Sequence, residues 1–163
     1  MLTMLKAPES SLFYAQGLRF SCIRCSACCR FDSGFVFLSE KDVSLLGTTL
    51  NMGYKEFIET YCRWVLSENR VFQLSLKEKS NYDCIFWVQD KNCSVYNARP
   101  QQCRAFPFWA SIVSDESSWE MTAKCCPGMD KGSLNSVDSI EKWLAIRENE
   151  PIISRSTKSK GES

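Results

Sequence analysis

Four cysteines crowded into eight residues constrain this chain more than any other feature of its sequence. They are Cys22, Cys25, Cys28 and Cys29, in the pattern C-x-x-C-x-x-C-C. A C-x-x-C spacing lets a tight turn direct two sulfurs at one ion while backbone amides point at the sulfurs. Because neighbouring side chains usually diverge, we expect Cys28 and Cys29 to face two metals, or two edges of one cluster, rather than one tetrahedral ion. The segment predicts a metal or redox loop.

The absence of histidine narrows the chemistry further. The 163 residues include 10 cysteines and no histidine. Without imidazole there is no Ser-His-Asp or Cys-His nucleophile, no histidine-ligated zinc catalyst and no two-histidine iron site. With 44% hydrophobic residues the chain can still bury a core. Any chemistry in this chain therefore depends on sulfur.

The redox state of the cellular compartment determines whether these cysteines are free thiols or disulfides. Residues 1–18 carry Lys6, Pro8 and Glu9 among their apolar positions, so they lack the continuous apolar region of a secretion signal. No run of about 18 apolar residues predicts a membrane span. We therefore expect a cytoplasmic protein with no membrane partner, whose cysteines are metal ligands or catalytic thiols. Disulfides stay open as the alternative, because small secreted scaffolds share this cysteine density.

Charge points to no nucleic-acid partner. The formal net charge is +1, with both signs spread along the chain. Nucleic-acid binding needs a basic patch or stripe, which this distribution does not provide. The expected partner is a metal ion, and the sequence indicates no particular protein partner.

Hydrophobic spacing predicts three helices. Ser39 is expected to cap a helix that runs toward Leu46 and ends at Gly47. Apolar residues repeat at helical spacing from Tyr54 to Leu66 and form one stripe. A last helix is expected from about Ser136 to Glu148.

Short apolar or alternating segments predict strands between these helices. Residues 35–38, 71–76 and 85–88 fit strands, and residues 90–92 fit a turn. Residues 106–113 and 119–123 flank a polar five-residue segment, which predicts a hairpin.

The predicted fold is α+β: a small irregular single domain with short strands and about three helices, organised around an all-cysteine metal site. We place the cysteine-cluster domain at residues 20–150. An N-terminal extension of residues 1–19 precedes it, and a flexible tail of residues 151–163 follows it.

A second group of cysteines follows in the middle of the chain. Cys84 and Cys93 come first, and Cys103 lies three residues after Pro100. Proline suits the first position of a helical turn, so Cys103 is expected one turn into a short helix, with its sulfur near Arg99 or Arg104.

The third group is the pair Cys125-Cys126, followed by Pro127. A proline after a ligand cysteine blocks competing regular structure and occurs in iron-sulfur loops. Cys126 is therefore the stronger ligand candidate of the two.

Together these motifs resemble the YkgJ-type cysteine-cluster family, whose members are described as zinc- or iron-chelating domains. The resemblance covers residues from about Phe20 to Gly128, and one departure is Ala27, where many relatives have glycine. It implies metal ligation by Cys22, Cys25, Cys28, Cys29, Cys84, Cys93, Cys103 and Cys126. Cys62, on the apolar stripe of the second predicted helix, is expected to be a core thiol, and the role of Cys125 stays open.

Eight thiolates can be divided in several ways. Two four-thiolate zinc sites, one iron-sulfur cluster plus a further site, or two clusters all agree with soft sulfur ligation. The C-x-x-C-x-x-C run with a remote Cys-Pro is nearer to ferredoxin ligation, which favours an iron-sulfur cluster over zinc. Arg99 and Arg104 are expected to support the thiolates. Five aromatic residues are expected to shield them from water: Phe86, Trp87, Phe106, Phe108 and Trp109.

The predicted function is therefore metal binding, with zinc or an iron-sulfur cluster as the cofactor. The alternative is an iron-sulfur redox enzyme or an accessory component of protein lysine methylation, since larger relatives of the resembled family include a flagellin lysine methylase. Thiol-disulfide exchange is a third hypothesis, but the βαβ pattern expected around such a motif is missing. No catalytic motif is evident.

Overall fold

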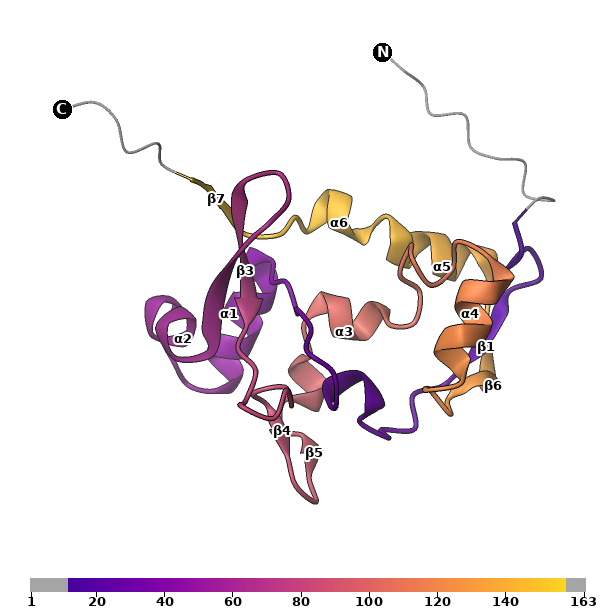
Figure 1. Ribbon diagram of the computed structural model, residues 1–163, viewed down its shortest axis with the longest axis horizontal. Coiled ribbons are helices and arrows are strands. Elements are labelled where there is room, and N and C mark those ends of the chain that lie inside the picture. The colour runs from indigo at the N-terminus through magenta and orange to yellow at the C-terminus, as the bar shows by residue number, and fades with distance from the viewer. Residues whose placement is uncertain (1–11, 158–163) are drawn as a thin grey trace, which may run out of the picture. The chain divides into compact units, whose positions relative to one another are not determined.

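The computed structural model describes residues 12–157, and these form two compact units. Unit 1 comprises residues 12–25 and 105–146, and unit 2 comprises residues 26–104 and 147–157. The chain crosses between them after Cys25, after Arg104 and after Ile146. The C-x-x-C-x-x-C-C run is therefore split between the two units. Figure 1 labels the helices and strands along the chain.

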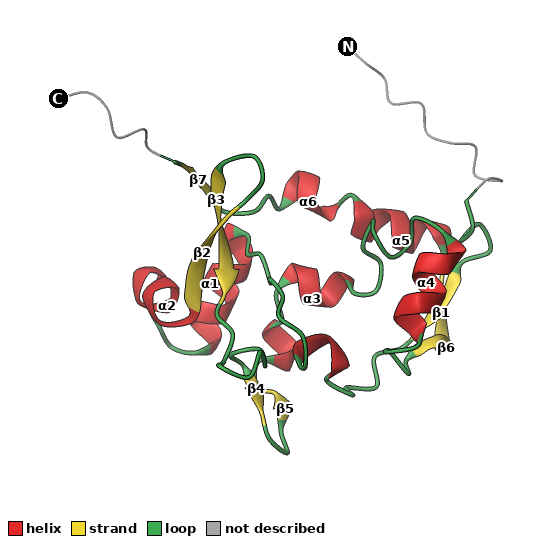
Figure 2. Ribbon diagram, in the orientation of Figure 1, coloured by secondary structure: helices red, strands yellow, loops and turns green. Residues whose placement is uncertain are grey.

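Unit 2 is built on a three-stranded antiparallel sheet with the strand order β2-β3-β7 (Figure 2). The strands are β2 (Cys62–Leu66), β3 (Val71–Leu76) and β7 (Ser154–Ser156). Two helices, α1 (Glu40–Thr49) and α2 (Tyr54–Tyr61), precede the sheet in the chain. The core of this unit includes the fully buried side chains of Leu38, Val43, Leu46, Phe57 and Leu74.

The first predicted helix forms where the sequence placed it, but it runs further. Ser39 and Asp42 make a capping box, in which the Ser39 hydroxyl accepts the Asp42 amide and the Asp42 carboxylate accepts the Ser39 amide. The expected stop at Gly47 is wrong: the helix continues to Thr49. Gly47 is buried there, close to the Met52 carbonyl oxygen.

The second predicted helix is too long. It ends at Tyr61, and the next five residues form β2, which pairs with β3 from Cys62↔Leu76 to Leu66↔Phe72. Helical spacing over 54–66 could not reveal this pairing partner, and the β-branched and aromatic residues of β2 suit a sheet. The prediction for β3 itself is confirmed.

The other predicted strands of unit 2 are short. Residues 85–88 contain only β4 (Trp87–Val88), which pairs with β5 (Asn92–Cys93) across the predicted turn. Residues 35–38 run beside β3 but form one isolated bridge, Phe37↔Ser75, instead of a strand. Three short helical segments complete this part of the chain: η2 (Ala27–Cys29), η3 (Tyr96–Ala98) and α3 (Gln101–Ala105).

Unit 1 contains one antiparallel pair, β1 (Leu18–Phe20) with β6 (Met129–Asn135). Helices α4 (Glu116–Ala123) and α5 (Val137–Leu144) lie in the same unit, and α6 (Ile146–Asn149) follows across the boundary. The core of unit 1 includes the buried side chains of Tyr14, Phe108, Trp119, Met129 and Ile140.

The hairpin predicted for residues 106–113 and 119–123 is wrong, because the second of these segments lies in α4. Asp115 caps this helix: its carboxylate accepts the Ser118 amide at 2.8 Å. A local cap of this kind favours a helix over a strand even where apolar residues alternate. The last predicted helix is confirmed in its first part, with Ser136 as the cap of α5, but a break at Ala145 separates it from α6.

The mixed α+β class is confirmed, whereas the expected number of about three helices is too low, since six α-helices occur among residues 12–157. Residues 154–156 of the predicted tail form β7, and β1 begins at residue 18 of the predicted extension and ends at residue 20 of the predicted domain. Residues 1–11 and 158–163 of those two segments lie outside the described residues.

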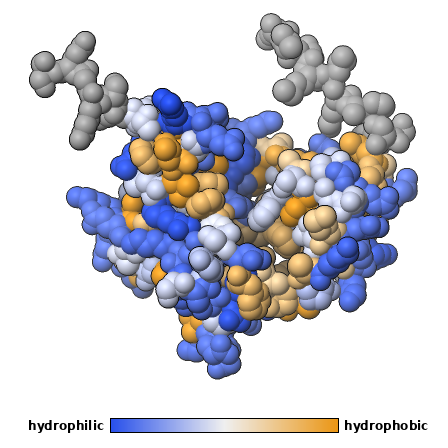
Figure 3. Space-filling model, in the orientation of Figure 1, coloured by the Kyte–Doolittle hydropathy of each residue, from blue (hydrophilic) through white to orange (hydrophobic). Residues whose placement is uncertain are grey.

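Among residues 12–157 no helix is both long and apolar enough to cross a bilayer. On the face drawn in Figure 3, hydrophobic residues occur in several small groups with hydrophilic residues between them.

Candidate metal centre

The loop that carries Cys28 and Cys29 is fixed inside unit 2. Ser26 adopts a left-handed conformation (φ 66°) and its carbonyl accepts the Cys29 amide at 2.9 Å, which closes the single turn of η2. The Ser26 hydroxyl donates to the Asn92 side chain at 3.0 Å. These contacts hold the end of the C-x-x-C-x-x-C-C run against the β4–β5 hairpin.

Cys84 is held beside the same turn. Its amide donates to the Cys29 carbonyl at 2.8 Å. The neighbouring residues reinforce this contact, because Arg30 forms an ion pair with Asp83 at 3.1 Å and lies 3.6 Å over the Trp87 ring. A residue 55 positions away in sequence is thus placed next to Cys29 by backbone and side-chain contacts together.

Cys93 is positioned by the short hairpin. It pairs with Trp87 in the β4–β5 ladder, and the next amide, of Ser94, donates to the Phe86 carbonyl at 2.9 Å. Phe86 and Trp87 are both buried. That these aromatic residues shield the thiols from water stays a prediction; the structure shows that Phe86 belongs to the core of unit 2.

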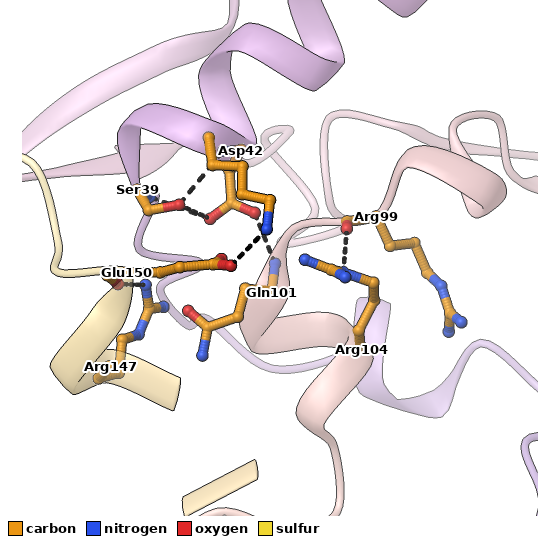
Figure 4. Close-up of polar contacts among 8 residues, drawn as sticks. Ser39, Asp42, Arg99, Gln101, Arg104, Arg147 and Glu150 are labelled. Carbon is orange, nitrogen blue, oxygen red and sulfur yellow. Dashed lines mark hydrogen bonds and ion pairs between the residues drawn. The ribbon is translucent and has the colours of Figure 1, made fainter. Parts of the chain in front are cut away.

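Cys103 is carried by α3, whose start is held by the buried carboxylate of Asp42 (Figure 4). One Asp42 oxygen accepts the Gln101 amide at 2.7 Å, and the other accepts the Ser39 amide at 2.9 Å. Asp42 therefore caps two helices, α1 and α3, at once. The predicted helical turn after Pro100 is confirmed, since the Arg104 amide donates to the Pro100 carbonyl at 3.0 Å.

The cap predicted at Ser39 is a local signal and gives no indication that Asp42 also binds the start of α3. The link of Asp42 to Gln101 joins positions 59 residues apart, and no pattern within either segment indicates it. Gln102 adds a second long-range link: its side chain accepts the Phe37 amide at 3.0 Å and donates to the Phe35 carbonyl at 2.7 Å. These side chains are the positioning residues that sequence reasoning missed.

Five thiols gather in unit 2, and we call them the five-thiol cluster: Cys28, Cys29, Cys84, Cys93 and Cys103. Cys28 interacts electrostatically with each of the other four. Burial raises the pKa of Cys84, Cys93 and Cys103. These thiols therefore hold their protons at neutral pH, and binding a metal has to displace them.

Cys28 and Cys29 lie closer together than adjacent side chains usually do. Their sulfurs are 3.7 Å apart, and the shared hydrogen bond lowers the pKa of Cys28 and raises that of Cys29. Two sulfurs bound at 2.3 Å to one tetrahedral zinc ion lie about 3.8 Å apart. The expectation that this pair diverges is wrong, and the observed spacing fits two ligands of a single ion.

Arg99 is a cation that acts on three thiols of this cluster, and Lys79 acts on Cys84. The charge of Arg99 lowers the pKa of Cys28, Cys93 and Cys103, in opposition to burial. The guanidinium lies 3.7 Å over the Tyr96 ring and donates to the Tyr96 carbonyl at 3.0 Å. Arg104 instead donates to the Arg99 carbonyl at 3.1 Å (Figure 4), so it supports the segment that carries Arg99.

The remaining predicted ligands, Cys22, Cys25 and Cys126, belong to unit 1. Strand pairing brings two of them to the same end of the β1–β6 ladder. Phe20, two residues before Cys22, pairs with Met129, three residues after Cys126. The Ser21 amide donates to the Gly128 carbonyl at 3.2 Å, and a Cβ at Gly128 would collide with the Ser21 carbonyl oxygen.

The structure thus gathers thiols without closing them around a common point. Within residues 12–157 no three thiol or carboxylate groups converge at ligand distances, so the predicted all-cysteine site is not formed as such. All ten cysteines are free thiols. Cys62 is buried in the core of unit 2, which confirms its predicted role as a core thiol.

Clustered thiols without histidine are typical of cysteine-rich metal-binding domains. The chain belongs to the CxxCxxCC family, described as a "putative zinc- or iron-chelating domain", which matches residues 21–131. This confirms the resemblance noted in the sequence.

The chain is also similar to a curated protein, "Uncharacterized protein MJ0661" of Methanocaldococcus jannaschii, with 28% identity over 100 residues. The alignment covers 61% of this chain and 50% of that protein, so the chain spans about half the length of this relative. No solved structure matches the chain.

Proposed function

We propose that this protein chelates zinc or iron through thiolates. The proposed ligands are Cys22, Cys25, Cys28, Cys29, Cys84, Cys93, Cys103 and Cys126. The observation that carries the proposal is the five-thiol cluster, which comes from four separate segments of unit 2 and includes one sulfur pair at 3.7 Å. The backbone and side-chain contacts around Cys29, Cys84, Cys93 and Cys103 join segments far apart in sequence, so these thiols lie in one part of unit 2.

The donor set fits a thiophilic ion. Thiolates suit zinc, iron-sulfur centres and copper(I), and the chain offers no imidazole to compete with them. Four thiolates around a divalent ion carry a net charge of about −2, and Arg99 supplies a nearby positive charge. Such a site has its coordination filled by protein, which favours structural binding, storage, transfer or sensing of the metal over catalysis on it.

An iron-sulfur centre, serving redox chemistry or an accessory role in protein lysine methylation, is the second candidate. The C-x-x-C-x-x-C run and the Cys126-Pro127 sequence favour it. Zinc is favoured instead by the Cys28–Cys29 distance, because that distance fits one tetrahedral ion. An iron-sulfur centre contains inorganic sulfide and absorbs visible light, whereas a zinc site has no sulfide and is colourless.

We include a reducing location, the cytoplasm, in the proposal, because cysteines must stay reduced to bind a metal as thiolates. The metal ion is the proposed partner; the near-neutral charge gives no support to nucleic acid.

Metal and acid-labile sulfide analysis of the full chain, purified without oxygen, tests this function. We expect at least one zinc or iron per chain, less metal per chain in the double variant C84S/C103S than in wild type, and the wild-type content in C62S, the matched control in the core. Sulfide together with visible absorption identifies a cluster, and zinc without sulfide identifies a mononuclear site. A wild-type chain that takes up neither metal, even after anaerobic reconstitution, contradicts the proposal.

A further inference from the structure

The boundary between the two units divides the cysteines into two sets, and each set has at least four thiols. It falls after Cys25, in the middle of the C-x-x-C-x-x-C-C run. Unit 2 holds the five-thiol cluster together with Cys62. Unit 1 holds four other thiols, which we call the unit 1 thiols: Cys22, Cys25, Cys125 and Cys126. A closed zinc site needs four thiolates, so each unit contains enough of them.

The five-thiol cluster is self-sufficient. Every contact that positions it comes from unit 2: the Cys84 amide on the Cys29 carbonyl, the β4–β5 ladder at Cys93, and Asp42 at the start of α3. Its supporting cation, Arg99, belongs to the same unit. No thiol of unit 1 is needed to complete four ligands there.

The unit 1 thiols share a different scaffold. The β1–β6 register brings Cys22 and Cys126 to one end of the ladder, and Cys25 follows Cys22 at the C-x-x-C spacing. Cys125 follows Lys124, the C-cap of α4, and its amide donates to the Thr122 carbonyl at 3.0 Å. Cys22, Cys25 and Cys125 are exposed, and Cys126 is 9% exposed.

Cys125 supplies the fourth thiol that unit 1 otherwise lacks. Without it this unit would offer three, one fewer than a closed tetrahedral site requires. The argument that adjacent cysteines diverge does not exclude it, because Cys28 and Cys29 lie with their sulfurs 3.7 Å apart in the same protein. Arg24 and Lys124 are sequence neighbours of unit 1 thiols and supply positive charge nearby.

We propose that the chain holds two metal centres, one in each unit, and that Cys125 is a ligand of the centre in unit 1. This inference depends on the proposed function, and each centre takes a thiophilic divalent ion, zinc or iron. Unit 2 uses four of its five clustered thiols, including both Cys28 and Cys29, and unit 1 uses Cys22, Cys25, Cys125 and Cys126.

Native mass spectrometry of the full chain, loaded with zinc alone under anaerobic conditions, tests the division. Wild type is expected to carry two zinc ions. The double variants C22S/C25S and C84S/C103S are each expected to carry one, and C62S is expected to carry two. Circular dichroism on each variant verifies that the chain stays folded, and hydrogen exchange locates the retained ion by the unit that it protects.

Cys125 is tested by C125S, whose exposed side chain makes the change compatible with folding. The variant is expected to lose zinc from unit 1 to a competing chelator at least about 10-fold more readily, since even outer-shell partners have effects of that size. Zinc in unit 2 is expected to be unchanged. Equal affinity in C125S and wild type overturns the role of Cys125.

The outcomes separate this inference from the function on which it depends. A wild-type chain with one zinc ion that is lost in both double variants has a single shared centre, which overturns the division and leaves metal chelation intact. A wild-type chain that binds no zinc or iron overturns both.

Discussion

The two units gather their thiols by different means. In unit 2, side chains and backbone from several segments fix the loops: the Arg30–Asp83 ion pair, the Asp42 carboxylate on α3 and the Cys84–Cys29 backbone hydrogen bond. In unit 1, the loops that carry the cysteines are held by the short β1–β6 ladder and the hydrogen bond from the Ser21 amide to the Gly128 carbonyl. Unit 2 has therefore gathered its thiols before any metal binds, whereas three of the four thiols in unit 1 are exposed.

This difference indicates that metal binding is coupled to folding more strongly in one unit than in the other. A preorganised site loses little conformational entropy when the metal binds, and a loosely held one loses more. The metal is thus expected to order unit 1 more than unit 2. The following variants test this contrast, beginning with the two cores.

The largest effects are expected from truncating one core at a time. Phe57 in unit 2 and Ile140 in unit 1 are both 0% exposed. F57A is expected to cost about 3–5 kcal/mol and I140A about 2–5 kcal/mol, through lost burial and the cavity left behind. Hydrogen exchange should show F57A exposing the amides of β2 and β3, and I140A those of β1 and β6.

The control for this pair is M121A, at a side chain on α4 that is 66% exposed, with an expected change within about 0.5 kcal/mol. If both core variants deprotect both ladders equally, the units unfold as one block, and the contrast between them fails.

The next effect concerns how unit 2 positions Cys103. D42A removes the acceptor for the amides of Ser39 and Gln101, which are both buried residues. The expected cost is about 3 kcal/mol, from two lost caps and buried donors without partners. Because α3 carries Cys103, zinc affinity should fall in unit 2 and stay unchanged in unit 1, as read by chelator competition.

Two further variants make this test specific. D42N keeps one oxygen acceptor and is expected to recover part of the affinity, and D138A changes an exposed acid in the first turn of α5 as a control for charge. An equal loss of affinity in both units after D42A would show general destabilisation instead of a positioning role.

The local elements of this fold were predictable, and the long-range links were not. The cap at Ser39, strand β3 and the turn after Pro100 all depend on residues within a few positions of one another. The local spacing of residues 62–66 predicts a helix because the partner strand β3 lies outside that window, and residues 119–123 alternate like a strand although the Asp115 cap starts a helix there. Strand pairing and buried long-range hydrogen bonds, such as that of Asp42 with Gln101, depend on how distant segments pack together.

The candidate site divides in the same way. Motif spacing identified the cysteines, since C-x-x-C turns and Cys-Pro are local signals. Which thiols share a unit could not be predicted, because the boundary cuts between Cys25 and Ser26 inside one motif. The close approach of Cys28 and Cys29 ran against the general tendency of neighbouring side chains.

A smaller effect tests whether membership of the five-thiol cluster, and not of unit 2, decides metal binding. Burial raises the pKa of Cys62 to about 12, so this thiol stays neutral at pH 8. It should react slowly with iodoacetamide in the metal-free chain, whereas the exposed Cys125 reacts fast. C62A is expected to cost about 1 kcal/mol with no loss of zinc. Rapid labelling of Cys62 in the folded chain would contradict its place in the core.

The smallest effect is expected from the cap of α4, the helix that leads into Cys125 and Cys126. The Ser118 amide lowers the pKa of Asp115, so its carboxylate is bound more favourably in the folded than in the unfolded chain. The resulting stability is present above the unfolded pKa of about 3.9 and is lost as the pH falls through the lower folded pKa. D115A should therefore lower the Tm at pH 7, and its difference from wild type should shrink in acid.

D115N is the matched variant, because asparagine caps helices about as well as aspartate and does not titrate. It should keep the Tm at pH 7. Since a frayed α4 loosens only unit 1, D115A is expected to make zinc more labile there while unit 2 keeps its ion. Release of zinc from unit 2 before unit 1 in D115A would contradict this prediction. It would also contradict the view that the thiols of unit 1 are held more loosely than those of unit 2.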